Sequence, residues 1–490
     1  MTKTKIILLG IFLLSIFAFL RFSKIYSTPV FVDEAIYVRW SQIMKAEASL
    51  RFLPMSDGKQ PLYMWATMPM FKVIPDPLIA ARTLSGLCGL GSAIGIVVLS
   101  FLLFKSTYVS LLSFLIYSVI PFTVFFDRMA LADSMLAMFG VWVLVFFKLF
   151  LDRRSLDWAM LSGFALGGGL LTKSPAIFFY LWLIIFGIFQ IEIRKENKKS
   201  LLNLLLGFFY VLIISQVMHA ILKLGPNSNM ADSRNLDYLY TFKEVLSHPF
   251  VPLIYNLQST FKWLWYLVSP TFLIAAILSF LDKKNIKKII LLLLLSITPL
   301  FAQGLIAKVY TSRYILFAIY PLIPLIGLGM SKLKNLLVIV LTTIPLTLSL
   351  WNIYSPQTAP MTFDMANGYY QEWTSGWGQK EVADYLLSLS KDDHKIVVFT
   401  EGFFGTLPDG LQIYTQHDPN ITVVGSAPIV KSLPEGLTNT DPNNDRFFVV
   451  NSSRNRLLEV DMAKLELISE YPKFPRSDGT RETLQFFRLK

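Results

Sequence analysis

The stretch IILLGIFLLSIFAFL (residues 6–20) decides the class of fold, because it follows Lys3 and Lys5 and contains no charged side chain. A secretory signal peptide would end at a small-residue cleavage site. The next residues, RFSKIYSTPVFVDEA, contain no such site. We therefore expect an uncleaved first transmembrane helix.

The composition of the whole chain agrees with this interpretation. Of the 490 residues, 54% are hydrophobic and 16% are charged, whereas soluble domains carry about 25% charged residues. We expect a mainly α-helical, polytopic membrane protein. The net charge of +12 comes from basic residues scattered between apolar segments, which argues against a nucleic acid partner. The single cysteine, Cys88, excludes an intramolecular disulfide.

Apolar runs long enough to cross a bilayer, each of ~20 residues, predict about eleven transmembrane helices. We place them near residues 6–22, 78–104, 107–126, 134–151, 157–172, 175–191, 201–222, 263–281, 288–306, 314–330 and 335–351. Basic residues lie just before the first segment and then in alternate connections between these helices. Their positions are 3–5, 105, 153–154, 194–199, 283–288 and 332–334. By the positive-inside rule these clusters are cytoplasmic.

This orientation predicts a domain organisation in the plasma (cytoplasmic) membrane. The N-terminus is cytoplasmic, and a transmembrane domain spans residues 1–351, with its first extracytoplasmic loop at 23–77. A linker (352–375) leads to a small extracytoplasmic α/β domain (376–490). There, residues 376–390 predict an amphipathic helix, and residues 395–400, 421–424, 446–450 and 484–489 predict strands.

Ionisable residues collect at the predicted outer ends of the helices, where charges near hydrocarbon are costly and are retained mostly where they pair or act. They are Asp33, Glu34, Lys59, Arg82, Asp127, Arg128, Asp133, Lys173, Lys308 and Arg313. Cations at headgroup depth would hold the phosphate of a lipid-linked ester, and a carboxylate would deprotonate an attacking hydroxyl. This combination suits glycosyl transfer from a polyprenyl-phosphate sugar.

Six motifs, in order along residues 30–325, then resemble those of the GT-C integral-membrane glycosyltransferases. The chain is similar to protein O-mannosyltransferases and to lipid A aminoarabinose transferases. The motifs are FVDEAIY (31–37), GKQPLYMW (58–65), AARTLSGLCGLG (80–91), DRMALADSMLAMF (127–139), LLTKSP (170–175) and SRYILFAIYPLIPL (312–325). Gln60 departs from the K-P-P-L pattern of the second motif, where the family has proline.

The resemblance implies a hexosyl or pentosyl transferase that acts with inversion at the outer membrane face. Asp33 matches the catalytic aspartate and would be the general base; alternatively, it caps a helix that begins near Ala35. Glu34 would orient the acceptor, with a solvated first-turn acid as the alternative. Asp133 would bind sugar or acceptor, or else cap its helix or pair with Arg128.

The resemblance also implies residues that bind the lipid-linked donor. Candidate ligands of the donor phosphate are Lys59, Arg82, Arg128, Lys173 and Arg313. The alternative for such basic residues is snorkelling toward the lipid headgroups. Tyr63 and Tyr314 would contact the lipid or substrate, unless they belong to an interfacial aromatic belt.

Several questions stay open at the level of sequence. No cofactor is required, although Glu34 and Asp133 leave room for a divalent metal of unknown identity. The acceptor is an unknown protein, lipid or glycan, and the remaining partners are the membrane lipids. The alternative function is a transporter or flippase of lipid-linked sugars, which broken helices and polar groups at mid-membrane would favour. A second alternative is a receptor-like protein with a degenerate transferase fold.

Overall fold

The computed structural model describes residues 2–490 except 195–197, 249, 391–394, 440 and 442–443, so the basic cluster at 194–199 is only partly described. The chain forms two compact units. The helical unit comprises residues 1–25, 49–66 and 82–360, and the mixed unit comprises residues 26–48, 67–81 and 361–490.

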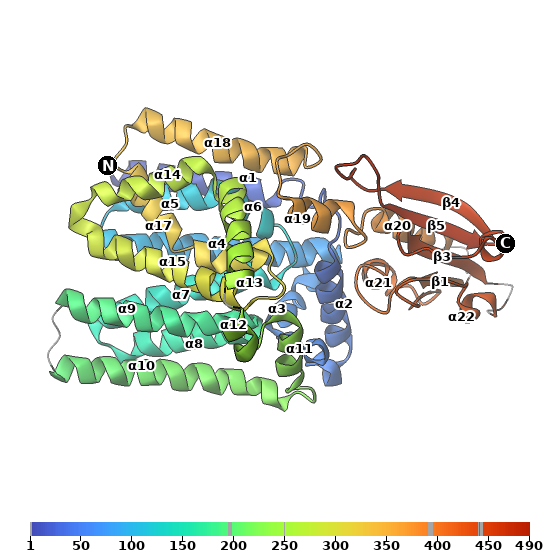
Figure 1. Cartoon of the computed structure of the whole chain (residues 1–490), viewed down its shortest axis with the longest axis horizontal. Helices are drawn as coiled ribbons and strands as arrows, with labels where there is room; N and C mark the ends of the chain where they lie inside the picture. Colours follow the sequence, from blue (N-terminus) through green and yellow to red (C-terminus); the bar gives the residue numbers. More distant parts are fainter. Residues whose placement is uncertain (1, 195–197, 249, 391–394, 440, 442–443) are drawn as a thin grey trace. The chain divides into compact units, whose positions relative to one another are not determined.

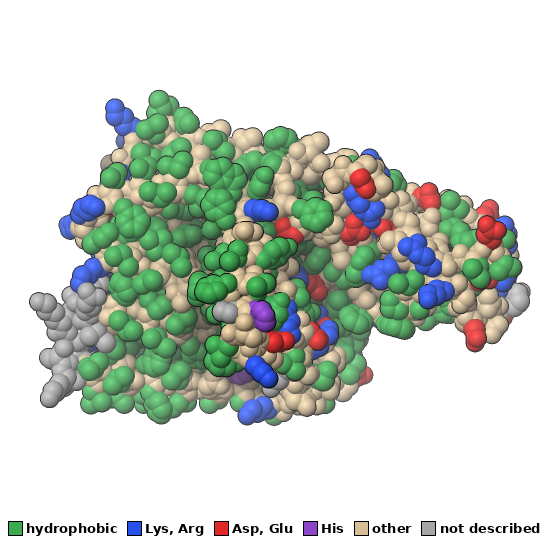
Figure 2. Space-filling model, viewed as in Figure 1, with side chains coloured by type: hydrophobic (Ala, Val, Ile, Leu, Met, Phe, Trp, Pro, Cys, Tyr) green, Lys and Arg blue, Asp and Glu red, His purple; other side chains and the backbone are tan. Residues whose placement is uncertain are grey.

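Apolar helices build the helical unit (Figure 1). The helices that lie wholly or mainly in it are α1 (Lys3–Phe22), α3 (Leu62–Thr67), α4 (Pro77–Phe104), α5 (Thr107–Val119), α6 (Pro121–Phe126), α7 (Ala132–Arg153), α8 (Leu156–Thr172), α9 (Phe178–Arg194), α10 (Lys198–His219), α11 (Met230–Tyr238), α12 (Phe242–Ser247), α13 (Phe250–Trp263), α14 (Pro270–Leu278), α15 (Ile286–Ile306), α16 (Leu316–Ile319), α17 (Leu322–Met330) and α18 (Asn335–Tyr354). On the visible face of this unit, hydrophobic side chains predominate (Figure 2), as lipid contact requires.

The helices are those of an integral membrane protein. Among the described residues, six helices are long and apolar enough to cross a bilayer, or up to eight if each bent pair counts as one crossing. Each of the eleven predicted segments contains helix, but the count of eleven crossings stays a prediction. The segment predicted at 263–281 instead belongs to a pair, Phe250–Val268 and Pro270–Leu281, bent by 96° at Ser269, whose φ is +84°.

Glycines explain how α8 packs closely against its neighbours. A methyl group at Gly163 would lie 2.9 Å from Cβ of Ile214 on α10, and one at Gly168 would lie 2.5 Å from the ring of Phe139 on α7. Small residues let membrane helices approach in this way. The glycine-rich segment therefore continues α8 to Thr172, and the chain turns at Lys173 before α9.

The mixed unit contains a five-stranded sheet in the order β2-β1-β3-β5-β4. Its strands are β1 (Ile396–Thr400), β2 (Ile421–Gly425), β3 (Asp445–Asn451), β4 (Leu465–Pro472) and β5 (Thr483–Leu489). Strands β1, β2 and β3 are parallel, whereas β5 is antiparallel to both β3 and β4. The predicted small α/β domain is confirmed, and β4 is a strand that the sequence pattern did not predict.

Helices cover the two faces of this sheet unequally. On one face, Val398 and Phe447 pack against α20 (Gln379–Leu389) and α21 (Asp409–Thr415). On the other face, Phe448 and Val450 pack against α22 (Glu435–Thr438). Successive strand residues point to opposite faces, which is why one strand serves both cores. The remaining helices of the unit are α2 (Val32–Ala46), α19 (Phe363–Ala366) and α23 (Glu459–Met462).

Candidate active site

The acidic motif opens α2 in the mixed unit. Because α2 begins at Val32, with Phe31 as its N-cap, Asp33 is the second helical residue and the alternative of a capping role is wrong. Glu34 is fully buried and accepts a hydrogen bond from the Phe31 N–H at 2.9 Å, so it is no solvated first-turn acid. This bond fixes the start of the helix and leaves Asp33 half-buried in the first turn.

Four predicted site residues meet in the helical unit. The Nζ of Lys173, at the end of α8, lies 2.6 Å from Oδ1 of Asp133, which is only 3% exposed. The same Nζ lies 4.5 Å from the centre of the Tyr314 ring, and the Arg313 guanidinium lies 5.2 Å from that centre. Asp133 is the second residue of α7 rather than its cap, and its ionic partner is Lys173 rather than Arg128.

The other predicted phosphate ligands on the first helices are engaged with backbone. Arg82 is fully buried and donates to the carbonyl of Ile25 at 2.8 Å. Arg128 donates to four carbonyls at and just beyond the end of α1, those of residues 20, 21, 23 and 24, at 2.8–3.1 Å. This geometry favours a role for Arg128 in holding the end of α1, because charged donors near the last carbonyls of a helix stabilise it.

Tyr63 also lies inside the protein. Its ring is fully buried, and its hydroxyl lies 2.9 Å from Oγ of Ser85 on α4. Burial does not suit an interfacial aromatic belt, whose rings sit at the headgroups. The arrangement instead ties the second motif to the third, and the contact of Tyr63 with lipid or substrate stays a prediction.

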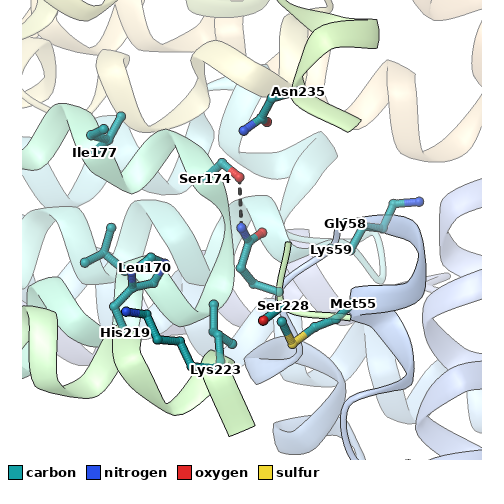
Figure 3. A pocket seen from close by; sticks show the side chains of 12 residues that line it. Met55, Gly58, Lys59, Leu170, Ser174, Ile177, His219, Lys223, Ser228 and Asn235 are labelled. Carbon is teal, nitrogen blue, oxygen red and sulfur yellow. Dashed lines mark hydrogen bonds between the residues drawn. The ribbon is translucent and has the colours of Figure 1, made fainter. Parts of the chain in front are cut away.

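A pocket of about 340 Å³ lies within the helical unit (Figure 3). Polar and apolar side chains share its lining. The lining residues are Met55, Gly58, Lys59, Gln60, Leu170, Ser174, Ile177, His219, Leu222, Lys223, Ser228 and Asn235. Such a mixture can accommodate an amphiphile, with its polar group near the basic residues and its chain along the apolar ones.

The second and fifth motifs meet in this pocket. Nε2 of Gln60 donates to Oγ of Ser174 at 2.8 Å, so the residue that departs from the family pattern joins the two motifs. Figure 3 shows this bond in the middle of the pocket, with His219 and Lys223 on one side and Lys59 on the other. The ammonium of Lys59 is turned away, toward the carboxylate of Asp57 at 2.6 Å.

Sequence reasoning missed several of the pocket residues. His219 lies in the helix predicted at 201–222, and Lys223 and Asn235 follow that helix, but none of the three belongs to a motif. All three line the pocket with Lys59. Their position depends on the return of the chain after α10, and no local pattern in the sequence indicates it.

A buried ion pair lies elsewhere in the helical unit. Arg21 and Asp127 are both fully buried, with 3.3 Å between guanidinium and carboxylate. Asp127 also accepts from the hydroxyl of Tyr117 at 2.9 Å and from that of Ser134 at 2.8 Å. Because its charge is satisfied inside the protein, we regard this pair as structural.

No group of three or more His, Cys, Asp or Glu side chains suited to hold a metal ion occurs among the described residues. Glu34 is engaged in the first turn of α2, and Asp133 is engaged with Lys173. The hypothesis of a divalent ion at these carboxylates stays a prediction.

Comparison with known proteins first identifies a family model. Residues 58–219, which contain four of the six motifs, match the model described as dolichyl-phosphate-mannose-protein mannosyltransferase. Comparison with curated proteins finds no match.

Solved structures resemble the fold over nearly the whole chain. ArnT from Cupriavidus metallidurans in the apo state has a TM-score of 0.59 at 13% identity, covering 99% of this chain and 98% of that one. The same protein bound to undecaprenyl phosphate has a TM-score of 0.58 at 14% identity, with the same coverage. The apo oligosaccharyltransferase of Archaeoglobus fulgidus has a TM-score of 0.54 at 10% identity, covering 91% of this chain and 70% of that one.

The resemblance deduced from the motifs is thus confirmed by two independent comparisons. The chain is similar in fold to ArnT and other GT-C glycosyltransferases, and in sequence, over residues 58–219, to the dolichyl-phosphate-mannose-protein mannosyltransferase family.

Proposed function

We propose that this protein is a glycosyltransferase that moves one sugar from a polyprenyl-phosphate carrier to an acceptor hydroxyl at the outer membrane face. The similarity to the mannosyltransferase family supports glycosyl transfer, and the ArnT structure bound to undecaprenyl phosphate supports a lipid-linked donor. In this proposal the N-terminus is cytoplasmic, and residues 376–490 form an extracytoplasmic domain.

The observation that carries the proposal is the pocket of the helical unit. Lys223 supplies positive charge, and Leu170 and Ile177 supply apolar surface. Lys59 adds a second charge once its ammonium turns from Asp57 into the pocket. A polyprenyl phosphate needs both kinds of surface. Its polyprenyl chain is apolar, and its phosphate becomes a more highly charged leaving group when the bond to the sugar breaks. Cations fixed near that position stabilise the developing charge. We propose Lys59 and Lys223 as donor-phosphate ligands, with His219 beside them.

The proposed reaction is a single displacement. Asp33 accepts the proton of the acceptor hydroxyl while the oxygen attacks the anomeric carbon. The bond from that carbon to the phosphate oxygen breaks, and the polyprenyl phosphate leaves with the electron pair. Attack opposite the leaving group inverts the anomeric configuration. Lys173, Arg82 and Arg313 are further candidate ligands of the donor, and Asp133 is a candidate ligand of the sugar or the acceptor.

The test is sugar transfer by the purified full chain in proteoliposomes. A panel of polyprenyl-phosphate sugars is supplied with a crude envelope fraction as acceptor, and release of polyprenyl phosphate and labelled product are both measured. We expect Asp33→Asn to lower turnover about 10²- to 10⁴-fold, the contribution of a general base. The matched control is Asp384→Asn, which alters an exposed acid of the same unit paired with Lys380 and should leave turnover unchanged. Equal turnover by wild type and Asp33→Asn would refute the assignment of the base.

One observation favours transport as the second candidate. Two helix pairs are bent, by 96° between Phe250–Val268 and Pro270–Leu281 and by 57° between Ser312–Ile319 and Leu322–Met330. At the bends, Ser269 bonds Thr271 at 3.0 Å and Tyr320 bonds Tyr117 at 3.1 Å, so both are satisfied inside the protein. Movement of lipid-linked sugar across the bilayer without any transfer would favour transport over catalysis.

A further inference from the structure

The carboxyl ends of the three parallel strands form a distinct edge of the mixed unit. From β1 the chain passes through α21 to β2 on one side, and from β2 it passes through α22 to β3 on the other. The two helices cover opposite faces of the sheet. The adjacent ends of β1 and β3 therefore form a topological switch point, the place where open α/β sheets bind ligands.

The loops at this edge are tied together. The Gly402 N–H donates to the carbonyl of Ala427 at 3.1 Å, which joins the loops after β1 and β2. The carboxylate of Glu401 accepts from the backbone N–H and the side-chain amide of Asn451, both at 2.8 Å, which joins the ends of β1 and β3. The guanidinium of Arg454 lies 4.2 Å from the centre of the Trp373 ring. The edge is thus a fixed surface.

The same edge lies against the acidic motif, within the same unit. A methyl group at Gly405 would lie 3.2 Å from Cγ2 of Val32, the residue that precedes Asp33. The Val32 N–H donates to the carbonyl of Thr374 at 3.0 Å, next to Trp373. The loop after β1 is therefore a neighbour of the proposed catalytic base.

Two phenylalanines project from this loop. Gly402 has a φ of +77° and Gly405 a φ of +116°, backbone conformations that glycine adopts without strain. The carboxylate of Asp409 accepts from the Gly405 N–H at 2.6 Å and holds the turn. Between the glycines, Phe403 is 69% exposed and Phe404 is 54% exposed. A constrained turn thus keeps two adjacent aromatic rings out of the core.

We propose that Phe403 and Phe404 bind a sugar ring of the acceptor and hold its hydroxyl beside Asp33. An aromatic ring offers a flat apolar surface for the C–H face of a pyranose, whose hydroxyls stay available to polar groups at its rim. A glycan acceptor suits this surface better than an acyl chain, because the carboxylate of Asp33 follows Val32 directly and the guanidinium of Arg454 lies on the same edge. This inference rests on the proposed function and gives the C-terminal domain a role in it.

The experiment compares kinetic constants for the two substrates in proteoliposomes. Hexyl hexosides serve as sugar acceptors and a Ser/Thr-containing peptide as the protein acceptor, with polyprenyl-phosphate sugar as donor. For Phe403→Ala/Phe404→Ala we expect the KM for the hexyl hexoside to rise about tenfold, from the loss of two stacking contacts, with the KM for the donor unchanged. Phe403→Trp/Phe404→Trp should stay close to wild type. Leu467→Ala, at a half-exposed position on β4, is the matched control and should change neither constant.

The outcomes distinguish failure of this inference from failure of the proposed glycosyltransferase function. In the double Ala variant, an increase in the donor KM or an unchanged acceptor KM would overturn the inference. Transfer by wild type in the same assay would still uphold the proposed function. Transfer to the peptide with rejection of every hexoside would overturn the glycan assignment. No transfer by wild type to any acceptor would refute the proposed function, and this inference with it.

Discussion

Replacement of Arg21 by methionine should destabilise the helical unit strongly. The guanidinium donates through Nε to Asp127 at 3.3 Å and through NH2 to Oγ1 of Thr123 at 2.8 Å and to the carbonyl of Tyr117 at 3.0 Å. It also bonds the carbonyl of Ser118. The variant keeps an apolar side chain of similar length but leaves the carboxylate of Asp127 buried without its cation.

The burial of both partners determines how much unfolding free energy the variant loses. Arg21 and Asp127 are each 0% exposed, so solvent does not replace the lost charge. Removing one partner of such a pair costs about 3–5 kcal/mol of unfolding free energy, roughly a hundredfold to a few thousandfold in the ratio of folded to unfolded protein. Removing the second charge as well, in Arg21→Met/Asp127→Asn, should restore about 1–3 kcal/mol, because the residues are in direct contact.

The assay is denaturant unfolding of the purified protein, followed by tryptophan fluorescence. Lys332→Met is the matched control, because it breaks a partly exposed pair with Asp282 that should be worth at most about 1 kcal/mol. A midpoint for Arg21→Met equal to that of wild type would refute the reasoning. A double variant as unstable as the sum of the two single variants would refute the coupling.

Three further predictions concern the pocket, the end of α1 and the C-terminal domain. Lys223→Ala should raise the KM for the polyprenyl-phosphate donor about 10- to 150-fold, as expected for a charge-assisted hydrogen bond of about 1.5–3 kcal/mol, and an unchanged donor KM would exclude Lys223 from the phosphate site. Arg128→Met should lower the unfolding temperature and leave the donor KM of the remaining folded protein unchanged; a raised donor KM would restore Arg128 as a phosphate ligand. Burial raises the pKa of Asp409 from 3.8 to about 6. The unfolding free energy of the domain therefore falls as the pH rises from about 4 to 6, and above that range it is about 3 kcal/mol lower than below it. Asp409→Asn, which keeps an acceptor for the Gly405 N–H, should therefore unfold at a higher temperature than wild type at pH 8, and this gain should vanish below about pH 4. Thermal unfolding at the two pH values measures the gain. An equal gain at both values would contradict the raised pKa of Asp409.

Much of the fold could be predicted from the sequence, because the information is local. A run of ~20 apolar residues leaves a chain in lipid no way to satisfy its backbone except as a helix. Each predicted segment accordingly contains helix. The short runs rich in Val and Phe at residues 395–400 and 446–450 likewise indicated strands of the C-terminal domain. The pattern of β4 was missed, because the strand lies at the sheet edge and carries exposed Glu466 and Glu470.

The sequence by itself also determined which motifs are present, and with them the similarity to GT-C glycosyltransferases. Only the tertiary structure decided which side chains meet. It paired Asp133 with Lys173 rather than Arg128, joined Gln60 to Ser174, and brought Lys223 to the pocket. These contacts join residues far apart in the chain, and they depend on how closely helices approach and in which register. That approach depends on packing of complementary surfaces, such as the glycines of α8 against α7 and α10, which no local pattern encodes.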